Sequence, residues 1–307
     1  MNIFDKLAAD GRTPVHILHG TDWWTDCDDI VALRLLCRAH KSGIIKLECV
    51  CADAVMEHTA ASIDAFILSE GLEDIPIGVD RNAYSTGERC RYQSVLAKYP
   101  HRISGNEACE DACRLYRRVL SRLDSKADIT EIGFPQIIHQ LLISPPDDIS
   151  PLDGMSLVKQ KVNKIWMMAG KWDTPDGREY NLINTPASRA AGHFICENSP
   201  VPLSFLGFEV GESVITGGGE PDGDLLRVGM AAHGSQNGRS SWDPMLALMA
   251  IINDEQAAGY RTVRGTARVN PETGENNFTE SPDGKHTYVV KAHSDEFYSE
   301  MINSLIK

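Results

Sequence analysis

Short apolar runs alternate with segments of helical periodicity over the first two thirds of the chain. The apolar runs are short and bounded by Gly, Pro, Asn or Asp, which predicts buried strands, whereas apolar residues spaced three or four apart predict amphipathic helices. The predicted strands cover residues 14–20, 44–52, 75–79, 127–133, 162–170 and 201–207. The predicted helices cover residues 28–43, 59–72, 106–123, 135–144 and 185–199.

This alternation predicts an α/β fold: a doubly wound, mostly parallel sheet with flanking helices. After residue 260 the pattern changes to antiparallel strands, 260–278 and 286–293, and a closing helix, 294–307. We expect a single domain, 1–307, in which about 262–307 forms a hairpin and helix appendage. In such sheets ligands bind outside the carboxyl ends of the strands, which directs attention to the residues that follow each strand.

The formal net charge of −13 over 307 residues disfavours nucleic acid and anionic membranes as partners, because both would be repelled. It suits a small neutral substrate or a bound cation. The eight cysteines lack paired spacing for zinc, and the N-terminal segment lacks the apolar core of a signal peptide. We therefore expect a cytoplasmic protein with reduced thiols that does not span a membrane.

Four aspartates, at positions 22, 26, 28 and 29, fall between the first strand and the first helix. Crowded carboxylates repel one another, so they need a cation, protons or solvent. Helix capping accounts for Asp28 and Asp29 but not for the other two. An EF-hand is excluded because its central glycine is missing and Leu33 replaces its last ligand. A phosphatase with an aspartyl nucleophile stays open, since 26–28 reads Asp-Cys-Asp, although it lies six residues past the strand.

The stretch GTDWWTDCDDIVAL (20–33), including Thr25-Asp26, resembles the acidic first loop of the inosine–uridine nucleoside hydrolase family. Three later blocks resemble the same family in order: ITEIGFPQII (129–138), IWMMAG with REYNLINTPASRAA (165–191), and RSSWDPMLAL (239–248). Two departures are Gly20, where the first Asp of that loop is usual, and Trp23-Trp24, which replaces a pair ending in Gly.

The resemblance implies calcium-dependent hydrolysis of the N-glycosidic bond of a ribonucleoside or close analogue, with Asp22 as base and Asp243 as a second catalytic residue. Such a reaction passes through an oxocarbenium-like transition state. Relatives are commonly homodimers or homotetramers, so a homo-oligomer is expected. The implied Ca²⁺ ligands are Asp22, Asp29, Asp243 and the carbonyl of Gln136. The implied substrate contacts are Asp28, Met168, Glu179, Asn181 and Trp242.

Three of these residues also have structural interpretations. Glu179 and Asn181 would share one face if their segment were extended, and otherwise they belong to a solvated loop. Asp243 precedes Pro244 and would serve as a helix N-cap, a role compatible with metal binding.

The acid that would protonate the leaving base is not identified by the resemblance. Some relatives place a His before the late Asp, but here Trp242 stands there, and an indole supplies no titratable proton. His233 is a candidate acid, and Trp23, Trp24 and Trp172 are further candidates for stacking on a base. A non-catalytic relative that binds a ribosyl ligand or metal without turnover is the alternative, motivated by Gly20 and the Trp pair.

Overall fold

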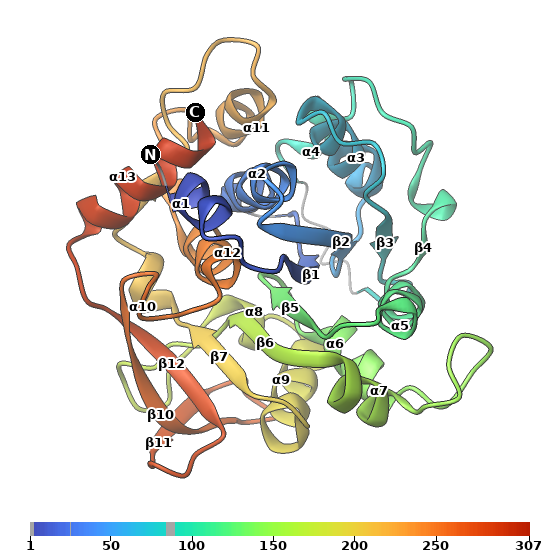
Figure 1. The fold of residues 1–307 in the computed structure, drawn as a ribbon, viewed down its shortest axis with the longest axis vertical. Helices are drawn as coiled ribbons and strands as arrows, with labels where there is room; N and C mark the ends of the chain where they lie inside the picture. Colours follow the sequence, from blue (N-terminus) through green and yellow to red (C-terminus); the bar gives the residue numbers. More distant parts are fainter. Residues whose placement is uncertain (1–2, 25, 84–89) are drawn as a thin grey trace.

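The computed structural model describes residues 3–24, 26–83 and 90–307, so Thr25 of the acidic loop lies outside the described residues. A ten-stranded, mostly parallel sheet runs through the molecule in the order β11-β10-β12-β7-β6-β5-β1-β2-β3-β4 (Figure 1). Its strands are β1 (Val15–Thr21), β2 (Ile45–Ala52), β3 (Ile77–Val79), β4 (Glu110–Asp111), β5 (Ala127–Glu131), β6 (Val162–Met168), β7 (Leu203–Leu206), β10 (Tyr260–Val269), β11 (Asn276–Glu280) and β12 (His286–Lys291). The predicted fold class is confirmed.

Helices cover both faces of the sheet (Figure 1), and each face buries its own apolar core. One core packs around α2 (Asp28–Lys41), α3 (Thr59–Ser69), α12 (Trp242–Ile252) and α13 (Asp295–Ile306). The other packs around α5 (Ala112–Arg122), α6 (Gln136–Ile143), α7 (Gly154–Lys161) and α9 (Pro186–Asn198). The shorter helices are α1 (Ile3–Ala9), α4 (Gln93–Leu96), α8 (Tyr180–Ile183), α10 (Phe208–Gly211) and α11 (Leu225–His233). Burial on both faces explains why the central strands read as continuous apolar runs.

The predicted helix over 106–123 is wrong in its first third. Residues Asn106–Ala108 form a 3-10 turn, and Glu110–Asp111 pair with β3 as the short edge strand β4. The side chain of Asp111 then accepts a hydrogen bond from the N–H of Arg114 and caps α5, which starts only at Ala112. The sequence did not reveal this cap, because acidic residues are favourable both in the first turn of a helix and at the N-cap position before it.

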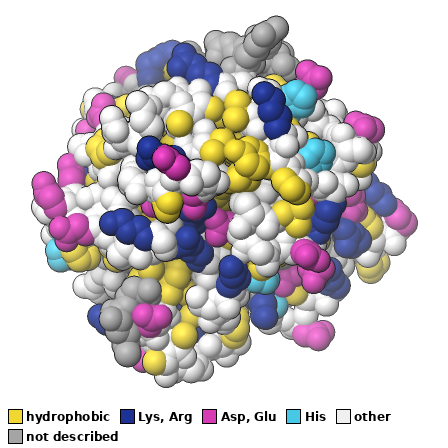
Figure 2. All heavy atoms as spheres, turned by 90° about the horizontal axis from the view of Figure 1, so that it is seen from above, with side chains coloured by type: hydrophobic (Ala, Val, Ile, Leu, Met, Phe, Trp, Pro, Cys, Tyr) yellow, Lys and Arg dark blue, Asp and Glu magenta, His cyan; other side chains and the backbone are white. Residues whose placement is uncertain are grey.

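The C-terminal hairpin is antiparallel as predicted, and it also extends the main sheet. β10 pairs antiparallel with both β11 and β12, while β12 pairs parallel with β7. A small second sheet joins β8 (Ile215–Thr216) to β9 (Arg239–Ser240), directly before α12. Among the described residues, no helix is long and apolar enough to span a bilayer. Acidic and basic side chains are interspersed over the face shown in Figure 2.

Candidate functional site

The carboxyl ends of the central strands open into a cavity of about 400 Å³. Strands β1, β5 and β6 lie side by side there, so residues that follow each of them meet at one rim. Six of the lining side chains are carboxylates and one is a guanidinium. The lining residues are Asp22, Asp26, Asp28, Asp29, Ile132, Met168, Glu179, Tyr180, Asn181, Phe208, Arg239, Trp242 and Asp243.

Three carboxylates come together at this cavity from two helix starts. One oxygen each of Asp28, Asp29 and Asp243 lies within 4.8 Å of the other two. Asp28 and Asp29 open α2, and Asp243 lies in the first turn of α12, whose packing against α2 places both helix starts at the same rim. Asp22 lines the same cavity without belonging to this closest group. Asp29 and Asp243 of this group are implied Ca²⁺ ligands by the family resemblance, and Asp28 is an implied sugar contact.

Hydrogen bonds from the backbone orient these acids. Asp28 Oδ2 accepts from the N–H of Asp243 at 3.0 Å, which joins the two helix starts. Asp29 Oδ1 accepts from the N–H of Trp23 at 3.0 Å and from the Thr21 hydroxyl. No described residue donates a hydrogen bond to the carboxylate of Asp243, which leaves both of its oxygens for a ligand. The N-cap of α12 is Ser241, so the sequence interpretation of Asp243 as that cap is wrong.

Burial and mutual repulsion raise the pKa values of these carboxyls. The pKa of Asp22 is raised by desolvation and then by the charges of Asp29 and its neighbours, and that of Asp28 by desolvation and Asp26. Desolvation also raises the pKa of Asp243, and that of Asp29 to about 6. An all-oxygen donor set with excess negative charge is what a hard dication prefers, so the residues present fit such an ion.

Glu179 and Asn181, the predicted sugar contacts, both line the cavity, but their backbone is not extended. Glu179 caps α8 through Oε1, which accepts from the N–H of Asn181 at 2.7 Å, while Oε2 accepts from Gly170 N–H at 3.0 Å. The segment is therefore a cap and a helical turn, not an extended strand. The Asn181 amide donates to the carbonyls of Ile132 at 3.1 Å and Met168 at 3.0 Å. Burial raises the pKa of Glu179 to about 7.

Of the four implied metal ligands, Gln136 alone does not line the cavity. It begins α6 and is 5% exposed, and its side-chain amide has no hydrogen-bond partner among the described residues. The turn before it does reach the cavity through Ile132. Its proposed carbonyl contact therefore depends on how that turn is held against Asp22.

The aromatic candidates divide between the cavity and the core. Trp242 lines the cavity, stacks on Phe208 with ring centroids 5.2 Å apart, and donates from Nε1 to the Phe208 carbonyl at 2.7 Å. Trp23 and Trp24 are buried in core clusters, and Trp172 packs on Phe205 in the second core. These three do not line the cavity, so they are core residues and not stacking platforms there.

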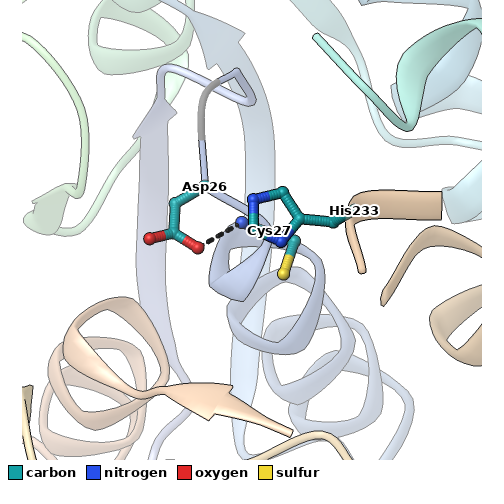
Figure 3. Close-up of side chains that lie close together, drawn as sticks. All are labelled: Asp26, Cys27 and His233. Atoms are coloured by element: carbon teal, nitrogen blue, oxygen red, sulfur yellow. Dashed lines mark hydrogen bonds between the residues drawn. The ribbon is translucent and has the colours of Figure 1, made fainter. Parts of the chain in front are cut away.

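His233, at the end of α11, lies beside Asp26 and Cys27, which precede α2 (Figure 3). These three could hold a metal by distance alone. However, both oxygens of Asp26 receive hydrogen bonds from Arg239, and Oδ1 also receives one from the N–H of Cys27. Burial raises the pKa of the Cys27 thiol, so it stays protonated. His233 does not line the acid cavity, which separates it from the proton-donor role suggested by the sequence.

Sequence reasoning missed four lining residues, Ile132, Tyr180, Phe208 and Arg239. Arg239 lies within a matched block, four residues before Asp243. Its ion pair with Asp26 of the first loop joins distant segments and left no signal in the sequence. Phe208 lies two residues after the end of β7, where a ligand site is expected, so its position was the available clue.

A larger cavity, about 690 Å³, lies at the amino ends of β6 and β7 and has different chemistry. Its charged lining residues are Lys159, Lys164, Glu255, Arg264 and Lys285. With four cations and one carboxylate it does not suit a metal ion, so we assign the site to the acidic cavity.

Similar chains were found only among solved structures. No protein-family model matches the sequence. No curated protein matches it either. An inosine-uridine preferring nucleoside hydrolase from Bacillus anthracis aligns over 96% of this chain and 99% of its own, with 15% identity and a TM-score of 0.66. A purine-preferring ribonucleoside hydrolase from Gardnerella vaginalis aligns over 95% and 99%, with 14% identity and a TM-score of 0.68.

The type III effector protein XopQ, solved as a complex with adenosine diphosphate ribose, aligns over 99% of this chain and 96% of its own. Its identity is 15% and its TM-score 0.69. At these identities the likeness speaks for the fold, and it extends over almost the whole chain in each comparison. The chain has the nucleoside hydrolase fold.

Proposed function

We propose that this protein hydrolyses the N-glycosidic bond of a ribonucleoside or close analogue with the help of calcium. The observation that carries the proposal is the meeting of the Asp28, Asp29 and Asp243 carboxylates within 4.8 Å, in a cavity that also presents amide and aromatic groups. The fold of known nucleoside hydrolases supports the reaction class.

In this proposal Asp22, Asp29 and Asp243 hold the ion, with the carbonyl of Gln136 as a further ligand and Asp28 beside them. A hard dication bound there would lower the pKa of water and would ligate sugar hydroxyls. Asp22 Oδ1 accepts from the N–H of Trp24 at 3.2 Å, and we assign its carboxylate to take the proton from the attacking water.

The sugar is held by Asp28, Glu179 and Asn181, with Met168 lining the wall between them. The N–H groups of the Asn181 amide are used by two carbonyls, which leaves its oxygen to accept from a hydroxyl. Positive charge that develops on the ring in the transition state is stabilised by the surrounding carboxylates. The stacked pair Trp242 and Phe208 offers an apolar face to the leaving base.

The test is hydrolysis of a panel of purine and pyrimidine ribonucleosides, assayed as released reducing sugar, with calcium and with chelator. We expect activity on at least one nucleoside, loss of that activity on chelation, and recovery when calcium is returned. No sugar release from any nucleoside in the presence of calcium would contradict the proposal.

A second candidate is binding without turnover. The XopQ neighbour was solved with adenosine diphosphate ribose, and this chain has Gly20 where an acid is usual. A rise in melting temperature with adenosine diphosphate ribose, together with no cleavage of it or of nucleosides, would favour this candidate. Cleavage of a nucleoside would exclude it.

A further inference from the structure

The Glu131 side chain on β5 lies directly against Gly20 on the neighbouring strand β1. Gly20 is paired with Glu131, and a Cβ added to it would lie 2.5 Å from Glu131 Oε1 and closer still to Oε2. Real side chains do not approach so closely, so the Glu131 carboxylate occupies the space that a side chain at position 20 would need. Gly20 has no positive φ, so space and not backbone conformation requires the glycine.

Glu131 is fully buried and forms a pair with Asp53, which directly follows β2 and is equally buried. Asp53 Oδ2 and Glu131 Oε2 have no hydrogen-bond donor among the described residues. Burial raises the pKa of Glu131 to about 8, and burial and the Glu131 charge raise that of Asp53. Neither carboxyl lines the cavity, and no step of the proposed reaction uses them.

The pair ties the end of β1 to the turn after β5. The N–H of Asp53 donates to the carbonyl of Thr21 at 3.0 Å, and Asp53 Oδ1 accepts from the N–H of Phe134 at 2.8 Å. Glu131 Oε1 accepts from the N–H of Gly133 at 3.3 Å. The two carboxyls thus hold the turn through the adjacent N–H groups of Gly133 and Phe134.

Asp22 lies directly against this turn. A Cβ on Gly133 would lie 2.6 Å from Asp53 Oδ1 and closer still to the backbone nitrogen of Asp22. The same turn carries Ile132, which lines the cavity, and leads into Gln136 at the start of α6. The distance between Asp22 and the turn is therefore fixed by the contacts of Asp53 and Glu131.

We infer that Glu131, with Asp53, is a positioning residue of the acid site: its carboxyl group supplies from β5 the acidic group that position 20 lacks on β1. This inference rests on the proposed function, because it assumes that the acids hold an ion. It implies that the carboxylate fits on either strand but not on both at once.

The test compares Glu131→Ala, Gly20→Asp and the double variant, with calcium affinity measured from the rise in melting temperature during a calcium titration. We expect Glu131→Ala to weaken calcium binding about tenfold, the size typical of losing a group that orients metal ligands. Gly20→Asp alone should be strongly destabilised by crowding. The double variant should bind calcium more tightly than Glu131→Ala, because the carboxylate returns to the same space from β1.

Asp128→Asn is the matched control, since Asp128 is a buried acid of the same strand, bonded to Trp166 Nε1 at 2.8 Å and outside the cavity. It should leave the calcium titration unchanged even if it lowers stability. Where Glu131→Ala does not fold, Glu131→Asp draws the carboxylate back by one methylene. In that background Gly20→Ala should lower the melting temperature less than it does in the wild type, and equal losses would overturn the inference.

Two results separate this inference from the proposed function. If wild-type protein shows no response to calcium, both fail, because there is then no ion site to position. If the wild type responds and Glu131→Ala binds calcium equally well, or the double variant is no better than Glu131→Ala, only the positioning role fails.

Discussion

At the residue scale, Asp243 is expected to lower the stability of the protein without an ion and to raise it when an ion is bound. Its carboxylate is buried beside Asp28, Asp29 and Asp22, and their charges and desolvation raise its pKa. No described donor compensates this charge. The residue is therefore unfavourable for stability unless a cation binds, which is the signature of a functional side chain.

We predict that Asp243→Asn raises the melting temperature of the chelated protein and abolishes most of the rise caused by calcium. Nucleoside hydrolysis should fall about 100-fold or more, since losing a ligand should cost at least as much as losing the groups that orient it. Thermal melting with calcium or chelator and kinetics on the best nucleoside measure both effects.

The control for this variant is Asp148→Asn, an exposed acid paired with Arg114 on the surface. It should change neither the calcium response nor the rate. A chelated Asp243→Asn protein less stable than wild type would contradict the view that the carboxylates repel one another.

At the element scale, the first turns of α2 and α12 are joined by a single side chain. Ser241, the N-cap of α12, makes no side-chain cap, and instead Asp28 Oδ2 accepts from the N–H of Asp243. Two positive helix ends thus face the same cluster of acids and partly offset its charge. The packing of α2 on α12 brings the acids together, and the dipoles of both helices stabilise the negative charge of these acids.

We predict that Asp28→Ala unfolds with a free energy about 1 kcal/mol lower than Asp28→Asn, as is typical of losing a helix cap. Asparagine keeps an oxygen that can accept from Asp243 N–H, whereas alanine leaves that donor unpaired. Denaturant unfolding in chelator measures the difference, and both variants should lose activity. Equal stability of the two would show that the cap contributes nothing.

The elements of the site were predictable because strand ends and helix starts follow from local patterns. The strand that ends at Thr21 and the helix that starts at Asp28 agree with the sequence to within two residues, which placed four acids at a strand end. Asn181 was predictable as a residue but not as part of a helical turn, because Glu179 caps that turn with its own side chain.

Other parts were not predictable because they depend on contacts between distant segments. Trp23 is buried with φ 47°, held by bonds to Thr21 and Asp29, and nothing local separates this from an exposed tryptophan. Glu131 offered one clue, an acid at the end of a strand buried on both faces. That its carboxylate fills the space above Gly20 follows only from the pairing of β1 with β5.

At the scale of the whole molecule, the buried acids make stability depend on pH. Burial raises the pKa of Asp29 from 3.8 to about 6, of Glu179 from 4.5 to about 7 and of Glu131 from 4.5 to about 8. The folded state therefore binds more protons than the unfolded state between the ordinary and the raised values. These three acids therefore make stability fall as pH rises through this range, whereas buried histidines such as His19, whose pKa is lowered from 6.5 to about 3, make stability rise with pH until the unfolded histidine has lost its proton.

We predict that the melting temperature in chelator decreases from about pH 7, above the ordinary pKa of histidine, to about pH 8, and that calcium reduces this decrease. Acids with lowered pKa, such as Asp147 at about 2 beside Arg117, are fully charged throughout and do not oppose the trend. Melting curves at each pH, with and without calcium, measure it. A melting temperature in chelator that rises over this range would contradict the assignment of these raised pKa values.

The meeting of Asp28 and Asp243, which are 215 positions apart in the chain, has a kinetic consequence. Contacts between such distant segments form late in folding, because the intervening chain must first be ordered. An ion that needs both residues therefore binds only weakly to partly folded molecules. Calcium should consequently lengthen the lifetime of the native state by slowing its unfolding, while leaving the rate of refolding from denaturant almost unchanged.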